Sequence, residues 1–137
     1  MSAIAEPVFL YVEDDPLSRE IMQVLMNGAM PDARLITFET SDRFMEKMLA
    51  LPTPPTVIFL DIHLEPLNGF QMLNLLRADP RYAATITIAV TASVMNEEVA
   101  QLKASGFDGA IGKPLDFDNF PTLLERIVAG EAVWHVV

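Results

Sequence analysis

The sequence predicts an α/β domain built on a doubly wound, five-stranded parallel sheet with helices on both faces. Three observations lead to this fold class. Short runs of consecutive apolar residues alternate with stretches in which apolar residues recur every three to four positions, the repeat of a helix. The apolar runs lack the polar alternation of a half-exposed strand, as expected for strands buried on both faces. The connections are short, and alternating strands and helices are typical of a parallel sheet.

The first half of the chain is expected to hold two strand–helix units. Val8–Val12 is a continuous apolar run that stops at acidic residues, and helical spacing begins at Pro16, a residue suited to a first helical turn. A second strand is expected at Arg34–Phe38. Ser41 or Asp42 is expected to cap the helix that follows it.

The second half is expected to hold three strands, each followed by a helix. The strands are expected at Thr56–Asp61, Thr85–Thr91 and Ala110–Gly112. The helices are expected from Asn68 and Gly69 to about Asp79, from a cap at Asn96 to Gly106, and from about Asn119 to Ala129.

The length of the chain is that of one domain. Residues 1–137 are expected to form it, with a core at about 8–130, and 51% of the residues are hydrophobic, enough for one sizeable core. The apolar tail at 131–137 is expected to pack back on the domain or on a partner. Trp134 in this tail suits either an anchor or a homodimer contact.

Composition and charge exclude several classes of protein. The chain has no cysteine, which excludes disulfides and thiolate metal sites. It begins without the basic and apolar regions of a signal peptide, and no apolar run reaches the about 20 residues needed to span a membrane. We therefore expect a cytoplasmic protein without a membrane partner. The net charge of −10 argues against nucleic-acid binding and is compatible with a divalent cation or a basic partner.

Residues with reactive or charged side chains follow directly after the expected strands. Glu13 and Asp14 follow the first strand, Asp61 ends the third, Thr91 ends the fourth, and Lys113 follows the fifth. Ligands of open parallel sheets bind beyond the carboxyl ends of the strands, so we expect these side chains to converge.

This set of side chains suits phosphoryl chemistry. Neighbouring carboxylates repel one another, and an all-oxygen set of this kind favours Mg²⁺, or Mn²⁺, as the cation that relieves the repulsion. Asp61 can then attack phosphorus as a carboxylate nucleophile, while Lys113 and Thr91 hold phosphoryl oxygens. Taken singly, Thr91 is more often a structural strand residue and Lys113 a surface lysine, and only the combination favours a site.

In their order and spacing, these motifs resemble the response regulator receiver domains of two-component signal transduction. The matching segments are Val12-Glu13-Asp14-Asp15, Leu60-Asp61 with Gly69 eight residues after the aspartate, Val90-Thr91-Ala92, and Lys113-Pro114. Each motif is weak alone, but the four together are highly specific, and they cover nearly the whole chain. The resemblance implies the strand order 2-1-3-4-5 of the chemotaxis-regulator fold.

The resemblance also implies a role for each site residue. The roles are Asp61 as phosphorylation site, Thr91 and Lys113 as phosphoryl-binding residues, and Glu13, Asp14, Asp61 and the backbone carbonyl of His63 as metal ligands. The family members accept a phosphoryl group from a sensor histidine kinase or a histidine phosphotransfer protein in a Mg²⁺-dependent reaction. Their chemistry is self-phosphorylation and autodephosphorylation, so we do not expect an enzyme acting on other substrates. His63 and Ser93 are the positions that influence the phosphoryl lifetime in the family.

Two positions depart from the family pattern. Glu65 replaces the usual proline four residues after the phospho-acceptor, and Ala110 replaces the aromatic residue whose inward rotation usually reports phosphorylation. The nearest aromatic residue, Phe107, lies three residues too early. We therefore expect output through another reporter.

Three hypotheses for function remain open from the sequence. The first is a stand-alone receiver, phosphorylated on Asp61, that signals to an unknown output protein through protein–protein contacts. The second, motivated by Ala110 and Glu65, is a receiver-fold binding module that is not phosphorylated. The third, a related aspartate-dependent phosphatase, ranks low because such enzymes resemble Asp-x-Asp-x-Thr, whereas His63 stands two residues after Asp61.

Overall fold

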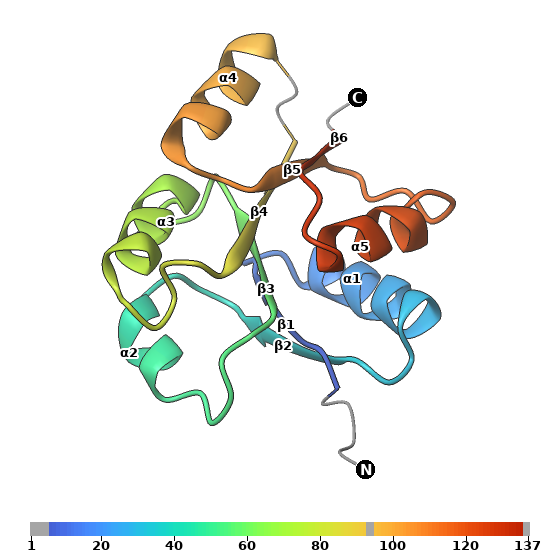
Figure 1. The fold of residues 1–137 in the computed structure, drawn as a ribbon, viewed down its shortest axis with the longest axis horizontal. Coiled ribbons are helices and arrows are strands. Elements are labelled where there is room, and N and C mark those ends of the chain that lie inside the picture. Colours follow the sequence, from blue (N-terminus) through green and yellow to red (C-terminus); the bar gives the residue numbers. More distant parts are fainter. Residues whose placement is uncertain (1–5, 93–94, 136–137) are drawn as a thin grey trace.

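The computed structural model describes residues 6–92 and 95–135, and within them six parallel strands form one sheet in the order β2-β1-β3-β4-β5-β6, accompanied by five helices (Figure 1). The elements are β1 Val8–Val12, α1 Pro16–Ala29, β2 Arg34–Phe38, α2 Phe44–Leu49, β3 Val57–Asp61, α3 Gly69–Ala78, β4 Ile86–Thr91, α4 Asn96–Ser105, β5 Gly109–Gly112, α5 Phe120–Val128 and β6 Val133–His135.

The core consists of two layers, one on each face of the sheet. Successive side chains of a strand point to opposite faces, so in β1 Leu10 and Val12 enter one layer while Phe9 and Tyr11 enter the other. Helices α2, α3 and α4 complete the first layer, and α1 and α5 complete the second (Figure 1). This double burial explains the uninterrupted apolar runs of β1 and β3.

Local capping fixes where two of the helices begin. Asp15 accepts a hydrogen bond from the Ser18 N–H at 3.1 Å, directly before Pro16 in the first turn of α1. Asn68 and Gln71 form a reciprocal capping box at the start of α3, with both bonds at 2.9 Å. Both helices therefore start on the loops that follow the strand ends of β1 and β3.

The expected caps of α2 and α4 were wrong. Helix α2 begins only at Phe44, after Arg43 in a left-handed conformation, and no side chain caps it. The Ser41 hydroxyl instead accepts a hydrogen bond from the Leu67 N–H at 2.8 Å, which ties the loop after β2 to the loop before α3. Asn96 is the first residue of α4 rather than its cap.

The expected number of strands was also wrong, because the tail adds a sixth. Val133–His135 pairs in parallel with β5, so that Gly109 faces Val133 and Ala110 faces Trp134. Val133 is buried. A side chain at Gly109 would overlap the Val133 carbonyl oxygen, so the strands approach closely only because glycine stands there. The expectation that the tail packs back on the domain is confirmed within the described residues.

Gly109→Ala is expected to lower the free energy of unfolding by about 1–3 kcal/mol, the usual cost of overpacking a filled site. Urea unfolding of the full chain measures it. Gly28→Ala on α1 is the matched control, because a methyl group there meets no atom within 4 Å and helical alanine is favoured over glycine. Equal stabilities of the two variants would contradict a tight β5–β6 contact.

Among residues 6–92 and 95–135, no helix combines the length and the apolar character that a membrane crossing requires.

Candidate functional site

Four adjacent strands deliver the expected site residues to one edge of the sheet. Glu13 and Asp14 follow β1, Asp61 is the last residue of β3, Thr91 is the last residue of β4, and Lys113 follows β5 by one residue. Because β1, β3, β4 and β5 are neighbours in the sheet, their carboxyl ends lie side by side. The convergence expected from the sequence is therefore present.

Lys113 connects two of the carboxylates. Its Nζ donates a short hydrogen bond to Glu13 Oε1 and a second one, of 3.1 Å, to Asp61 Oδ2. The side chain of Glu13 is almost completely buried, whereas that of Lys113 is 21% exposed. The ammonium thus neutralises two buried acids from the solvent side of the site.

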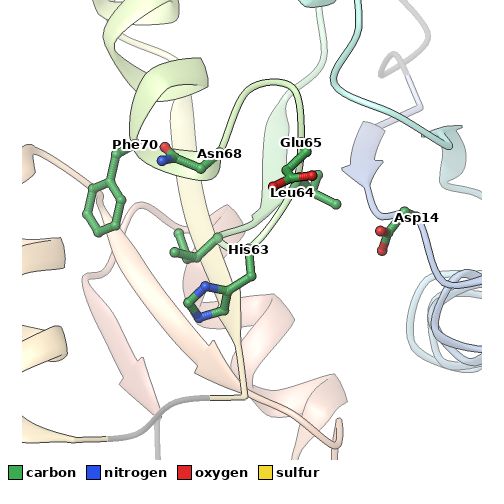
Figure 2. A pocket seen from close by; sticks show the side chains of 7 residues that line it. Asp14, His63, Leu64, Glu65, Asn68 and Phe70 are labelled. Atoms are coloured by element: carbon green, nitrogen blue, oxygen red, sulfur yellow. The ribbon is translucent and has the colours of Figure 1, made fainter.

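Three carboxylates form a cluster that could hold a cation. One oxygen each of Glu13, Asp14 and Asp61 lies within 4.8 Å of the other two. Asp14 is exposed and lines an open cavity of about 620 Å³ together with residues of the β3–α3 loop. Figure 2 shows Asp14 on one side of this cavity and His63, Glu65 and Asn68 on the other. A small ligand can therefore reach the cluster from solvent.

Further hydrogen bonds hold Glu13 in place. The Tyr11 hydroxyl donates to Glu13 Oε1 at 2.9 Å, and the Asp15 N–H donates to Oε2 at 3.2 Å. Arg19 donates to the backbone carbonyl of Glu13 at 2.9 Å. Tyr11 was missed from the sequence, although its position two residues before Glu13 puts both on the same side of the chain.

The carboxylates differ in their tendency to ionise. Burial by itself disfavours a charged Glu13, but the hydrogen bonds around it, above all the one from Lys113, outweigh burial and lower its pKa to about 2. Burial and the neighbouring Glu13 carboxylate instead raise the pKa of Asp61, against the opposing effects of the His63 N–H and Lys113. Desolvation and Glu13 raise the pKa of Asp14 in the same way. The ionised forms of Asp14 and Asp61 are therefore disfavoured, in part by repulsion from Glu13, and a bound cation would offset this repulsion.

Lys113 stays protonated in this site. Burial alone would lower the pKa of its ammonium, but its hydrogen bonds to Glu13 and Asp61 and their charges reverse the effect and raise the pKa. The site thus combines a permanent positive charge with an acid cluster.

Thr91 and His63 meet at a residue that the sequence did not single out. The buried Thr91 hydroxyl donates to Glu98 Oε1 in α4 at 3.1 Å, and His63 Nε2 lies 3.7 Å from the same oxygen. The His63 side chain is 63% exposed, while its backbone N–H donates to Asp61 Oδ1 at 3.1 Å. Ser93 lies outside the described residues.

The two departures from the family pattern are both visible. Glu65 lines the cavity on the side opposite Asp14 (Figure 2). Ala110 is fully buried, and its neighbour on β6 is Trp134. Phe107, the nearest aromatic residue, is buried and packs at nearly a right angle against Phe70, with ring centroids 5.9 Å apart.

A doubly wound parallel sheet with an acid cluster, a threonine and a lysine at the carboxyl ends of its strands defines an α/β domain of the chemotaxis-regulator type. The chain belongs to the response regulator receiver domain family, whose family model matches residues 9–125. It is therefore a receiver domain of the kind found in two-component response regulators.

Several curated proteins are similar over most of the chain. "Stress response regulator protein 1" of Meyerozyma guilliermondii is 28% identical over 109 residues, which are 80% of this chain and 50% of that protein. "Response regulator Rre1" of Synechocystis sp. is 26% identical over 130 residues, 92% of this chain and 54% of that protein. This chain thus spans about half the length of these two relatives. An uncharacterised 14.6 kDa protein of Leptolyngbya boryana is 24% identical and is covered over 92% of its length.

Solved structures share the fold. The chemotaxis response regulator CheY4 of Vibrio cholerae has a TM-score of 0.78 at 20% identity, covering 90% of this chain and 99% of that one. The receiver domain of the sensor histidine kinase PA1611 of Pseudomonas aeruginosa, solved with a magnesium ion in its active-site cleft, has a TM-score of 0.77 at 18% identity, covering 91% and 99%. At these identities the similarity establishes the fold alone.

Proposed function

We propose that this receiver domain accepts a phosphoryl group on Asp61 and changes its protein contacts in response. One observation carries the proposal. The Asp61 carboxylate accepts a hydrogen bond from the Lys113 ammonium at 3.1 Å and clusters with Glu13 and Asp14, and Asp14 lines a solvent-accessible cavity. Charge neutralisation and positioning are the main requirements of phosphoryl transfer, and this arrangement supplies both.

The proposed reaction is a simple displacement at phosphorus. An oxygen of the Asp61 carboxylate forms a P–O bond while the P–N bond of the donor's phosphohistidine breaks. The electron pair of that bond returns to the imidazole nitrogen, which takes up a proton from water. Lys113 and Thr91 are proposed to bind the phosphoryl oxygens, so that the charge passing from donor to acceptor is neutralised throughout.

The residues present suit a magnesium ion. The cluster offers only carboxylate oxygens, the ligands that Mg²⁺ prefers. Burial and the neighbouring Glu13 carboxylate raise the pKa of Asp61 and of Asp14, and a cation would relieve this repulsion. We propose Glu13, Asp14, Asp61 and the His63 backbone carbonyl as the ligands, with Mn²⁺ as an alternative ion. When bound, the ion would supply positive charge opposite the phosphoryl oxygens.

The donor is proposed to be a sensor histidine kinase or a histidine phosphotransfer protein. Residues 1–137 are proposed to act as one receiver domain in the cytoplasm, with output through protein–protein contacts and without nucleic acid. The chemistry is confined to the domain's own aspartyl phosphate, so no turnover of other phosphoesters is proposed.

Incubation of the full chain with Mg²⁺ and acetyl phosphate is expected to add the mass of one phosphoryl group, measured by intact-mass spectrometry. Asp61→Asn is expected to remain unmodified, because the amide is a poor nucleophile. Asp118→Asn, an exposed aspartate in the loop before α5, is the matched control and is expected to behave like wild type.

A second candidate function is a binding module that is not phosphorylated, which the buried Ala110 favours because the usual aromatic reporter is missing. That candidate predicts an unmodified wild type under the same conditions. Equal modification of wild type and Asp61→Asn would contradict the primary proposal, because another residue would then be the acceptor.

A further inference from the structure

Helix α4 is weakly held in the core. Leu102 is its one buried residue within the described part of the chain, whereas α3 and α5 each bury four. Elements with few buried apolar contacts shift at low free-energy cost. Polar contacts at its two ends therefore have a large share in fixing where α4 lies.

The first turn of α4 is attached to the site. Glu98 accepts the hydrogen bond from the Thr91 hydroxyl at 3.1 Å, and His63 Nε2 lies 3.7 Å from the same oxygen. The Glu98 side chain is 20% exposed, so this contact is partly shielded from solvent. Two strand ends of the site, those of β3 and β4, are thus joined to one helix through one carboxylate oxygen.

The last turn of α4 is attached to the sixth strand. Lys103 Nζ lies 5.1 Å from the centroid of the Trp134 ring, a cation–π contact. Trp134 faces Ala110 across the β5–β6 pairing and packs against the same core layer as Ala110 and Leu102. Glu98 and Lys103 are five residues apart, a rise of about 7.5 Å along a helix, so α4 is a short rod between the site and Trp134.

A Thr91 hydroxyl that binds a phosphoryl group on Asp61, as proposed above, has to give up its present hydrogen bond to Glu98. The hydroxyl has one proton and cannot donate it both to Glu98 and to a phosphoryl oxygen. The phosphoryl group also adds a charge of about −1.5 to −2, and this negative charge repels the Glu98 carboxylate. The present Thr91–Glu98 contact therefore belongs to the unphosphorylated protein.

We propose that Glu98 is a positioning residue that retains Thr91 on α4 until phosphorylation of Asp61 exchanges the hydrogen bond, and that the resulting shift of α4 alters the contact between Lys103 and Trp134. This inference rests on the proposed phosphorylation of Asp61. It gives the domain a reporter on β6, beside Ala110, the position at which the family's usual aromatic residue is absent. Glu98 acts through Thr91 and takes no part in bond formation.

Trp134 is the single tryptophan of residues 1–137, so its fluorescence reports this contact directly. Mg²⁺ with beryllium fluoride, a phosphoryl mimic, is expected to change the Trp134 emission of wild type. Lys103→Met is expected to reduce this change by at least half while the acetyl phosphate adduct still forms to the wild-type extent.

Glu98→Ala is expected to lower the acetyl phosphate concentration for half-maximal modification by about 5- to 10-fold, the range for loss of one competing hydrogen bond. Its emission without phosphodonor is expected to lie closer to that of phosphorylated wild type. Glu98→Gln, which can still accept the bond, is expected to fall between. Glu97→Ala, an exposed glutamate in the same turn, is the matched control and is expected to match wild type.

The outcomes separate the two proposals. A wild-type adduct without a change in Trp134 emission, or equal behaviour of Glu98→Ala and Glu97→Ala, would overturn the role of α4 and leave Asp61 phosphorylation standing. An absent wild-type adduct would overturn the phosphorylation of Asp61 and this inference with it.

Discussion

Lys113→Met is expected to slow phosphorylation of Asp61 by about 10²–10³-fold, the usual effect of removing one preorganised donor to a developing anion. Methionine keeps most of the apolar side chain but removes the ammonium that contacts both Glu13 and Asp61. The rate of adduct formation from acetyl phosphate, followed by intact-mass spectrometry, measures the effect.

The same variant is expected to be less stable without Mg²⁺. Breaking a fully buried ion pair costs about 3–5 kcal/mol, and we expect about 2–3 kcal/mol here because Lys113 is 21% exposed. The pKa of Glu13, held at about 2 largely by the hydrogen bond from Lys113, should rise at the same time. Saturating Mg²⁺ should recover part of the lost stability, because the ion replaces the missing positive charge.

Lys47→Met on α2 is the matched control, because this substitution removes the same charge at a position outside the site, where Lys47 contacts the Phe38 ring. It is expected to phosphorylate at the wild-type rate. A Lys113→Met variant as fast as Lys47→Met would show that Lys113 has only a structural role.

Asp14→Asn is expected to weaken Mg²⁺ binding by at least about 10- to 100-fold, because it removes a proposed ligand charge from the cluster. Asp14 is exposed, so the substitution should change the stability of the metal-free protein by less than about 0.5 kcal/mol. The variant therefore separates metal binding from folding.

Thermal unfolding with and without Mg²⁺ measures this difference. At a concentration 100 times its dissociation constant, the ion should stabilise wild type by about 2.7 kcal/mol, and the same concentration should stabilise Asp14→Asn much less. Asp32→Asn, an exposed aspartate in the turn before β2, is the control and should respond like wild type. An equal response of Asp14→Asn would place the ion elsewhere.

The parts of the fold that follow from local rules were predictable. The expected bounds of β1 and β2 were correct to the residue, and the order of the first five strands followed from the family resemblance. The site was predictable for the same reason, since the topology alone brings the ends of parallel strands together. Asp61 and Lys113 are 52 residues apart in the chain yet hydrogen-bonded.

The misses involve contacts that are remote in sequence. The local sequence around Ser41 suggests a helix cap, but its hydroxyl accepts a hydrogen bond from the Leu67 N–H in the loop before α3, 26 residues away. The sixth strand is only three residues long, and its identity depends on the close approach to Gly109. Glu98 resembles any acidic residue in a first helical turn until the packing of α4 places it beside Thr91.

The placement of β6 has a practical consequence for labelling and immobilisation. Because β6 is the outermost strand on its side, any peptide, dye or surface attached beyond His135 would be joined directly to the segment that carries Trp134. Such an attachment would apply force to β6 and would change the fluorescence of Trp134 independently of phosphorylation. Attachment before β1 acts at the opposite end of the strands from Asp61, so the amino-terminal side is the better anchor for biosensor or single-molecule work.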